Sequence, residues 1–408
     1  MTTKKNLPRT EFLFFFSIYF IMFITGLAVL STGAILPEIV TEFDISYDMA
    51  GVLLSLQAVG NMSALIISGY LSDIVGRKAV LLCGSLMIAV GFLGVAFTSV
   101  ATALFGLIFI SGCGWGINNI VSGILNDVTG GSTKHLNRLH MFFAVGAFTA
   151  PFFVIFAGAL DMGWRTVFGT IGALAVCSVV LLIFIKIPMS IPKEPSHKNK
   201  SRVMFDAFKK PHYYIFLAIA FTYTAVETVM NGWITTYFQG TGILTNVQAK
   251  TVLSLIWISI MVGRITVSIV GDKIKKEQII IICSALILVF STVLIQLNSF
   301  IGVAICVVIL GLGLSAVIPT NLANAAGVTS GSGVALGVLL ASGGMGAAVG
   351  PIITGATAEY LSSSMASEFL GLSASMWVAV AFAAVLLLMA FINCILSKRA
   401  KSPASSTL

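Results

Sequence analysis

Charged residues are scarce in this chain of 408 residues, where Asp, Glu, Lys and Arg together make up 9% and hydrophobic residues 58%. A soluble domain carries about 25% charged residues, because ionic groups must cover its surface. The shortage excludes a soluble enzyme, a disordered chain and a nucleic-acid-binding module. The formal net charge of +8 would indicate an anionic partner only if the cations clustered on one folded surface.

Paired cysteines and metal-ligand clusters are also lacking. The cysteines all fall inside apolar segments, far apart and with no Cys-x-x-Cys pair: Cys83, Cys113, Cys177, Cys283, Cys306 and Cys394. We therefore expect no disulfide framework, no metal site and no cofactor. The connecting segments contain no cluster of His and Glu, no nucleophile beside a base and no phosphate-binding loop, so we do not expect an enzyme.

Long apolar segments take up most of the sequence. A membrane-spanning helix uses roughly 20 apolar residues, and segments of that kind recur along the whole chain. The sequence therefore predicts an all-α integral membrane protein with twelve transmembrane helices. The predicted spans are residues 12–36, 50–71, 79–97, 101–125, 140–160, 166–187, 213–237, 247–270, 278–297, 301–325, 334–361 and 373–396.

The lysines and arginines fall on alternate connections. With the N-terminus in the cytoplasm, 20 of the 23 lie in stretches that become cytoplasmic; Arg165 and Lys250 lie on the other side and Arg264 within a span. This bias predicts that both termini are cytoplasmic, in a multi-pass protein of the cell inner membrane. The first outer loop is expected to hold acids instead, namely Glu38, Glu42, Asp44 and Asp48.

The two halves of the sequence repeat each other at an offset of about 199 residues. The pair of glycines at Gly112 and Gly114 returns at Gly311 and Gly313, and Pro151 returns as Pro351 with the small residues before it. Duplicated halves are common in membrane transporters. The expected organisation is an N-terminal six-helix half at residues 1–187, a cytoplasmic linker at 188–211 and a C-terminal six-helix half at 212–408.

The connection between spans 2 and 3 carries a motif, which reads Gly69-Tyr70-Leu71-Ser72-Asp73-Ile74-Val75-Gly76-Arg77-Lys78. With the span count and the duplication, it resembles the major facilitator superfamily, whose loop reads Gly-x-x-x-Asp-Arg/Lys-x-Gly-Arg-Arg/Lys. The resemblance implies two pseudo-symmetric halves that expose a central site to alternate sides. It also implies gating residues in both copies of the loop: Gly69, Asp73, Gly76, Arg77, Lys78, Asp272 and Lys273. The alternative is that Arg77 and Lys78 only fix the topology.

Two further stretches give a finer resemblance. One follows span 4, from Leu136 to Pro151, and the other is the polar pattern in span 7, from Tyr223 to Tyr237. Together they resemble the fucose and glucose:proton symporter branch and its bacterial relatives. This resemblance implies uptake of a small polar solute, a sugar or related neutral metabolite, by proton-coupled symport.

Polar side chains recur along several spans. Such residues are costly in lipid unless they face protein or a water-filled cavity, so they mark candidate pathways. Amides and hydroxyls beside aromatic rings suit a neutral polyhydroxylated solute, although Asn and Ser also hold helices together. The candidate substrate-binding residues are Gln57, Asn61, Asn118, Asn119, Ser122, Tyr223, Asn231, Trp233, Asn321 and Asn324.

Glu227 is the acid nearest the middle of any predicted span. Burial disfavours the charged form of a carboxyl group, so a side chain there can load and release a proton as the cavity changes sides. Glu227 is therefore the candidate proton-coupling residue. Sodium, with Glu227 and Asn231 as oxygen ligands, stays an alternative coupling ion.

A second function is open on the same scaffold, an exporter of drugs or metabolites by proton antiport. Such antiporters usually have an arginine in span 4, four residues before the first glycine of a Gly-x-Gly. Counting back from Gly112 or Gly114 gives Ile108 or Ile110, so this arginine is absent. Arg264 either binds an anionic substrate or reaches towards the membrane surface. The expected partners are a small-molecule substrate, the coupling ion and the lipid bilayer, with no nucleic acid, and the protein is expected to be a monomer.

Overall fold

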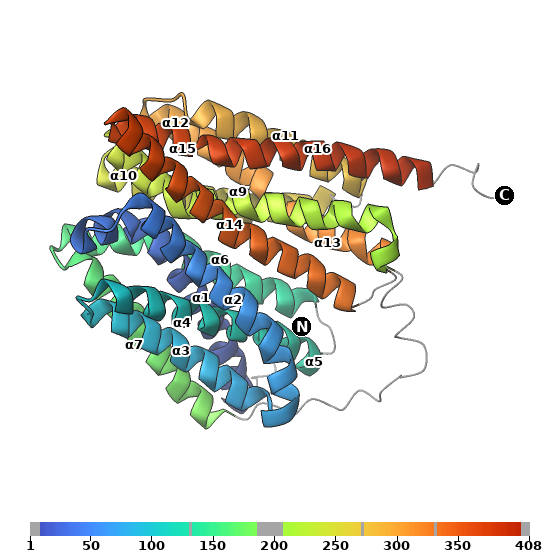
Figure 1. Cartoon of the computed structure of the whole chain (residues 1–408). Helices are drawn as coiled ribbons and strands as arrows, with labels where there is room; N and C mark the ends of the chain where they lie inside the picture. The colour runs from blue at the N-terminus through green and yellow to red at the C-terminus, as the bar shows by residue number, and fades with distance from the viewer. Residues whose placement is uncertain (1–8, 130–132, 186–206, 271–272, 330–332, 401–408) are drawn as a thin grey trace, which may run out of the picture. The chain divides into compact units, whose positions relative to one another are not determined.

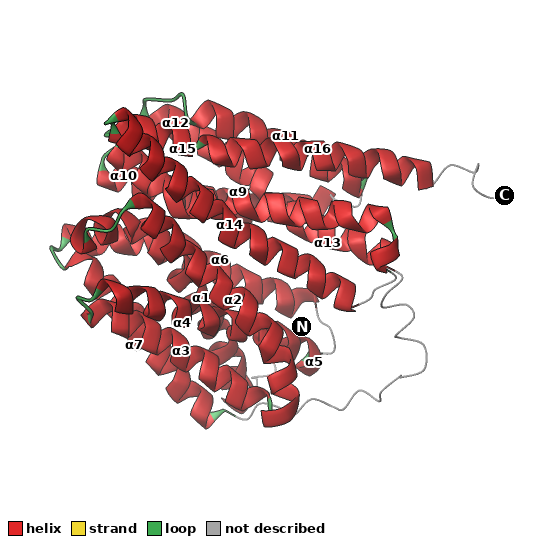
Figure 2. Ribbon diagram, in the orientation of Figure 1, coloured by secondary structure: helices red, strands yellow, loops and turns green. Residues whose placement is uncertain are grey.

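The computed structural model describes residues 9–129, 133–185, 207–270, 273–329 and 333–400. Over these residues the chain consists of helices and short connections, with no strand (Figure 2). Twelve stretches are long and apolar enough to cross a membrane. Twelve membrane-length helices, as predicted from the apolar segments, are thus confirmed.

The chain divides into two compact units. The first comprises Met1–Glu38 and Leu56–Lys193, and the second Ile39–Ser55 and Glu194–Leu408. The boundary between the units therefore falls inside α1 and inside α2, although each of these is one continuous helix. Most of the expected linker, residues 188–206, lies outside the described residues, and the predicted boundaries of the two halves stay a prediction.

The helices of the first part of the chain follow one another with short connections (Figure 1). They are α1 (Arg9–Phe43), α2 (Tyr47–Val75), α3 (Arg77–Phe97), α4 (Ala101–Asn118), α5 (Ile120–Val128), α6 (Thr133–Ala159) and α7 (Gly163–Phe184). In the first unit, apolar side chains from α1, α3, α5 and α7 form a buried cluster that includes Ile18, Leu81, Ile124 and Leu182. This cluster lies at one end of the helices and joins them there.

The second part of the chain is built in the same way. After the short 3-10 turn η1 (Ala207–Lys209) come α9 (Pro211–Gly240), α10 (Asn246–Val270), α11 (Lys276–Leu294), α12 (Phe300–Leu314), α13 (Val317–Val328), α14 (Gly333–Met365), α15 (Glu368–Ser375) and α16 (Trp377–Ala400). Phe216 of α9 packs with Ala325 of α13 and Leu339 of α14 in the buried core of the second unit.

Helix packing repeats at the offset that the sequence shows. A Cβ added at Gly112 would meet the backbone carbonyl of Gln57, and one added at Gly311 would meet that of Ile256, 199 residues further on. Gly114 and Gly313 likewise approach the carbonyls of Gly84 and Cys283, again 199 residues apart. The repeated glycines therefore serve equivalent close helix contacts inside each unit.

Spans 4 and 10 are each interrupted. The helix stops at Asn119, between α4 and α5, and at Ser315 and Ala316, between α12 and α13. Neither break was predicted from the sequence, although Pro319, in the first turn of α13, lacks the N–H that would bond the carbonyl of Ser315. A break leaves backbone carbonyls without partners in their own helix, and broken helices are frequent at transporter binding sites.

The first connection is shorter than expected. Helix α1 continues through Pro37 to Phe43, so Glu38 and Glu42 lie in the helix rather than in an outer loop, and Asp48 belongs to α2. Apolar residues persist beyond the proline: Ile39 is buried, and Val40 and Phe43 are half-buried. The expectation of a four-acid loop was therefore wrong; only Asp44, with a φ of 49°, lies in the turn.

The segment Ile39–Ser55 is bound within the second unit by hydrogen bonds to α14 and α15. The hydroxyl of Ser55 donates to the carbonyl of Ala348 at 2.5 Å, and the amide of Tyr47 donates to Oε2 of Glu359 at 3.0 Å. The hydroxyl of Tyr47 donates to Glu368. These contacts explain why this segment groups with the second unit.

Candidate functional site

Three polar residues on successive turns of α9 carry the candidate site in the second unit. The hydroxyl of Tyr223 lies 3.1 Å from Oε1 of Glu227 and 2.6 Å from the carbonyl oxygen of Leu314, the last residue of α12. One turn further on, Oδ1 of Asn231 accepts a hydrogen bond of 3.1 Å from the indole nitrogen of Trp257 on α10. The predicted polar stripe therefore faces neighbouring helices of its own unit.

Arg264 supplies a positive charge near this stripe. It lies on α10, half-buried, and acts electrostatically on both Glu227 and Tyr223. Its Nε is buried and has no hydrogen-bond partner among the described residues. A cation whose Nε has no acceptor among the described residues thus lies within electrostatic range of the carboxyl group of Glu227.

Trp233, offered above as a stacking platform, is covered in this structure. Its side chain is 0% exposed, and its ring lies 6.2 Å from the ring of Tyr47, centroid to centroid. Its indole nitrogen is buried without a hydrogen-bond partner among the described residues. A solute could reach this ring only after a rearrangement of its neighbours.

The amides of the first unit fall into two groups. Gln57 donates to the hydroxyl of Thr32 at 3.3 Å, Asn118 to the hydroxyl of Thr25 at 3.5 Å, and Asn119 to the carbonyl of Trp115 at 3.3 Å. The first two are buried and connect helices, as packing residues do. Asn61 and Ser122 are half-buried, and Nδ2 of Asn61 has no partner among the described residues.

The amides of α13 differ in the same way. Asn321 is fully buried and donates to the carbonyl of Phe216 at 3.0 Å. Asn324, one turn further along, is half-buried, and its Nδ2 has no hydrogen-bond partner within the described part of the chain. Asn61 and Asn324 are therefore the predicted substrate-binding amides whose buried Nδ2 lacks a partner among the described residues.

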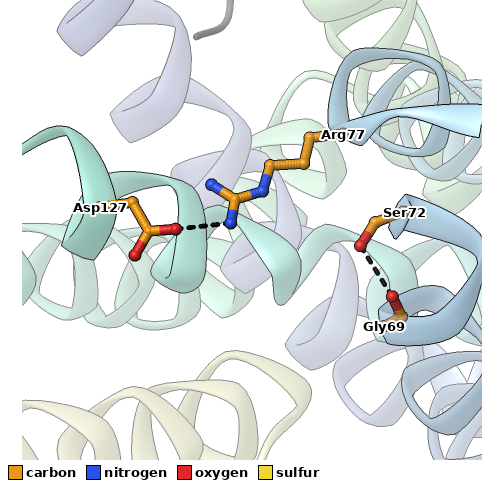
Figure 3. Close-up of polar contacts among 4 residues, drawn as sticks. All are labelled: Gly69, Ser72, Arg77 and Asp127. Carbon is orange, nitrogen blue, oxygen red and sulfur yellow. Dashed lines mark hydrogen bonds and ion pairs between the residues drawn. The ribbon is translucent and has the colours of Figure 1, made fainter. Parts of the chain in front are cut away.

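The predicted gating loop centres on an ion pair that the sequence analysis did not predict. Helix α2 ends at Val75, Gly76 adopts a φ of 86°, and α3 begins at Arg77. Nη2 of Arg77 lies 2.5 Å from Oδ2 of Asp127 at the end of α5 (Figure 3). The sequence spacing suggested Asp73 as the partner, but the helix does not continue to Arg77, and the side chain of Asp73 lies outside the described residues.

The other loop residues make local contacts. The hydroxyl of Ser72 donates to the carbonyl of Gly69 at 2.8 Å (Figure 3). The ammonium group of Lys78 donates to the carbonyls of Ile183 and Ile185 at the end of α7, both at 2.8 Å. In the second copy of the motif, Lys273 is exposed, and Asp272 lies outside the described residues.

Asp127 is a functional candidate that a closer look at charge could have found. It is an acid at a membrane side where the sequence places nearly all cations. The distribution of cations over the connections predicts topology, whereas Asp127 follows only from the carboxylates that those cations could bind. Trp257, which holds Asn231, offered no comparable signal.

Gly76→Ala is expected to destabilise the protein by about 1–3 kcal/mol, because its φ and ψ are adopted almost only by glycine. Nothing lies within 4 Å of the added Cβ, so the cost is backbone strain alone. Gly69→Ala is the matched control, since Gly69 lies in the α2 helix with open space around it. Thermal unfolding in detergent should lower the midpoint for Gly76→Ala only; equal midpoints for the two variants would contradict the prediction.

The sequence as a whole was compared with known proteins. The family model described as Major Facilitator Superfamily matches residues 18–330. The chain belongs to the major facilitator superfamily. It is a secondary transporter rather than an enzyme, and as a member of this superfamily it binds a small-molecule substrate within the membrane.

Curated relatives of this superfamily transporter are distant. It is 23% identical over 277 residues to a protein named TsgA homolog from Serratia proteamaculans (strain 568), covering 66% of this chain and 68% of that protein. It is 28% identical over 210 residues to the tetracycline resistance protein, class H, of Pasteurella multocida, covering 48% of this chain and 52% of that protein. The chain thus matches about half the length of the tetracycline resistance protein.

Solved structures share the fold of this superfamily transporter. A bacterial homologue of the human lysosomal transporter Spinster, inward-facing and unoccupied, gives a TM-score of 0.77 at 13% identity, covering 97% of this chain and 99% of that one. The nucleoside transporter NupG gives 0.74 at 16%, covering 96% and 100%. A D-xylose-proton symporter gives 0.73 at 13%, covering 94% and 97%. At these identities the likeness establishes the fold alone.

Proposed function

We propose that this transporter imports a small polar neutral solute, a sugar or related metabolite, by alternating access coupled to the entry of a proton at Glu227. The observation that carries the proposal is the position of Glu227 on α9, hydrogen-bonded to Tyr223 and within electrostatic range of Arg264. A carboxyl group can move a proton between two sides only if its surroundings accept both of its forms. The hydroxyl of Tyr223 is a hydrogen-bond partner for the protonated form, and the positive charge of Arg264 favours the ionised form.

The proposed solute contacts are those side chains that keep hydrogen-bonding capacity. Asn61 in the first unit and Asn324 in the second each have a donor without a partner among the described residues. Amides donate and accept in fixed directions, so they suit hydroxyl-rich solutes without net charge. Ser122 and Asn231 complete the proposed set, and the buried Asn118, Asn321 and Gln57 are assigned to helix packing.

The similarity in fold to a D-xylose-proton symporter and to a nucleoside transporter supports a polar neutral solute. We place the chain in the fucose and glucose:proton symporter branch on the stretch from Leu136 to Pro151 and on the polar pattern of span 7. The expected monomer, cytoplasmic termini and inner-membrane location belong to the same proposal, as do the gating roles of both loops.

Export by proton antiport is the second candidate function. The similarity to a tetracycline resistance protein over 210 residues favours it. A drug substrate of that kind would differ from a small neutral sugar. The two functions predict opposite directions of movement under the same pH gradient, and this difference makes them separable.

Glu227→Gln is expected to abolish solute accumulation driven by a pH gradient while retaining exchange of labelled for unlabelled solute. Glutamine keeps the hydrogen bonds of a protonated carboxyl group but cannot release a proton. Purified protein in liposomes, with the outside acidified, should be screened against neutral sugars, nucleosides and lipophilic cations. The variant should accumulate at least about tenfold less of any solute that the parent takes up, which corresponds to about 1.4 kcal/mol of lost coupling.

Glu42→Gln is the matched control, because it changes a carboxyl to an amide at the exposed end of α1. It should transport like the parent. A Glu227→Gln variant that responds as steeply to pH as the parent would reject proton coupling at this residue. Outward movement of lipophilic cations alone would favour the exporter. Accumulation driven by a sodium gradient would show that sodium, and not the proton, is the coupling ion.

A further inference from the structure

The hydroxyl of Tyr223 has two neighbours but a single proton. It lies 2.6 Å from the carbonyl oxygen of Leu314 and 3.1 Å from Oε1 of Glu227. A carbonyl can only accept, so the proton of Tyr223 belongs to the shorter of the two contacts. The contact with Glu227 then needs a proton from the carboxyl group itself.

The distances support this assignment. A hydroxyl that donates to an ionised carboxylate makes a bond of about 2.5–2.7 Å, shorter than the 3.1 Å between Tyr223 and Glu227. The bond to the carbonyl of Leu314 has the length of a good neutral hydrogen bond, near 2.7 Å. Donation from a protonated Glu227 to Tyr223, and from Tyr223 to the carbonyl, would supply each of the two contacts with its own proton.

We propose that protonated Glu227 donates to Tyr223, which in turn donates to Leu314, so that the proton on Glu227 controls the break between α12 and α13. This inference rests on the proposed role of Glu227 in proton coupling. Leu314 is the last residue of α12, and its carbonyl is one of those that lack a partner in their own helix. Tyr223 supplies that partner from another helix.

Loss of the proton changes the acceptor that Tyr223 prefers. A carboxylate is a stronger acceptor than a peptide carbonyl, so the hydroxyl turns from Leu314 to Glu227. The charged and titratable groups that face the pair are Arg264 from α10 and Cys283 from α11. Arg264, whose Nε has no partner among the described residues, then balances the carboxylate, and the carbonyl at the helix break is released.

The first unit has the break but not this connection. The position equivalent to Leu314 is Trp115, 199 residues earlier, and its carbonyl accepts from Asn119 in the same span. The positions equivalent to Tyr223 and Glu227 are Ile24 and Ala28, which carry no polar group. Among the described residues, Ile24 and Ala28 therefore do not give the break in the first unit the connection that Tyr223 and Glu227 give the break in the second.

Hydrogen exchange at the start of α13 tests the connection. In the parent, the protection factors of the amides that follow Leu314, which are exchange rates corrected for the base-catalysed rise of the intrinsic rate with pH, should fall by about fivefold as the pH rises, the equivalent of losing one neutral hydrogen bond. Glu227→Gln should stay protected at every pH, because its amide still donates to Tyr223. Tyr223→Phe should exchange fast at every pH.

Tyr213→Phe is the matched control. This buried tyrosine of α9 also donates to a carbonyl, that of Ala335 at 2.6 Å, and its loss should leave the pH response of α13 intact. Protection factors at α13 that do not change with pH in the parent would overturn the inference, even where Glu227→Gln abolishes coupled uptake. Parent-like coupled uptake in Glu227→Gln would instead reject the proposed function.

An infrared measurement reports on the same bond without relying on exchange. The carboxylic-acid C=O band that Glu227→Gln removes should shift in Tyr223→Phe and stay in place in Tyr213→Phe. A band that does not respond to Tyr223→Phe would show that Glu227 does not donate to Tyr223, and the inference would fail.

Discussion

Gly146→Ala is expected to destabilise the first unit by about 3 kcal/mol, lowering the unfolding midpoint by about 6–12 °C. An added Cβ would meet the carbonyl of Phe23 and come within 2.9 Å of the amide nitrogen of Leu27, both backbone atoms of α1. The contact is reciprocal, because Gly26 of α1 approaches the carbonyl of Phe143 on α6. Backbone atoms cannot move aside as a flexible side chain can, so the two helices must separate.

Gly158→Ala is the control for this prediction. It lies on the same helix, α6, and nothing stands within 4 Å of its added Cβ. Alanine is favoured over glycine in a helix by about 1 kcal/mol, so this variant should be as stable as the parent or slightly more stable. Thermal unfolding of both purified variants in the same detergent checks the prediction, and equal midpoints would contradict it.

The sequence predicted the parts of the fold that depend on one segment at a time. Spans follow from the length of apolar runs, and the duplication follows from glycines that recur at one offset. The sequence showed that Gly112 recurs at Gly311, but not that Gly112 and Gly146 approach the carbonyls of Gln57 and Phe23. Those partners depend on how helices cross, which the order of residues along one helix does not specify.

The candidate site shows the same limit. The stripe of Tyr223, Glu227 and Asn231 was predicted because these residues lie four apart on one helix. The partner Trp257 comes from the next helix and the partner Leu314 from a helix 91 residues away, and the carbonyl of Leu314 has no side-chain signal at all. A backbone acceptor exposed by a helix break is visible only in a structure.

The partner of Arg77 illustrates how local spacing misleads. Asp73 lies four residues before Arg77, the distance of a helical ion pair. The helix that contains Asp73 ends at Val75, before Gly76, so Arg77 does not belong to it. Arg77 binds Asp127, 50 residues further along the chain. A turn glycine between two charges is therefore evidence against their pairing across it.

Arg77→Asp is expected to reduce transport by at least about tenfold, the equivalent of about 1.4 kcal/mol. In the parent, Oδ2 of Asp127 lies 2.5 Å from Nη2 of Arg77. The substitution places a carboxylate opposite Asp127, so that repulsion replaces the attraction. We expect this pair to hold α3 to α5 during the conformational cycle, in line with the gating role proposed for the loop. Initial rates of uptake in liposomes, corrected for the amount of inserted protein, measure the effect.

Exchange of the two charges separates gating from topology. The double variant Arg77→Asp with Asp127→Arg restores the attraction and keeps one cation at the same end of the helices, so it should recover much of the lost rate. Asp127→Asn removes no cation, so a residue pair that only fixed topology would tolerate it. We expect Asp127→Asn to slow transport by about fivefold, since a hydrogen bond between charged groups contributes at least about 1 kcal/mol when partly exposed. Full activity of Asp127→Asn, together with no recovery in the double variant, would assign Arg77 to topology alone.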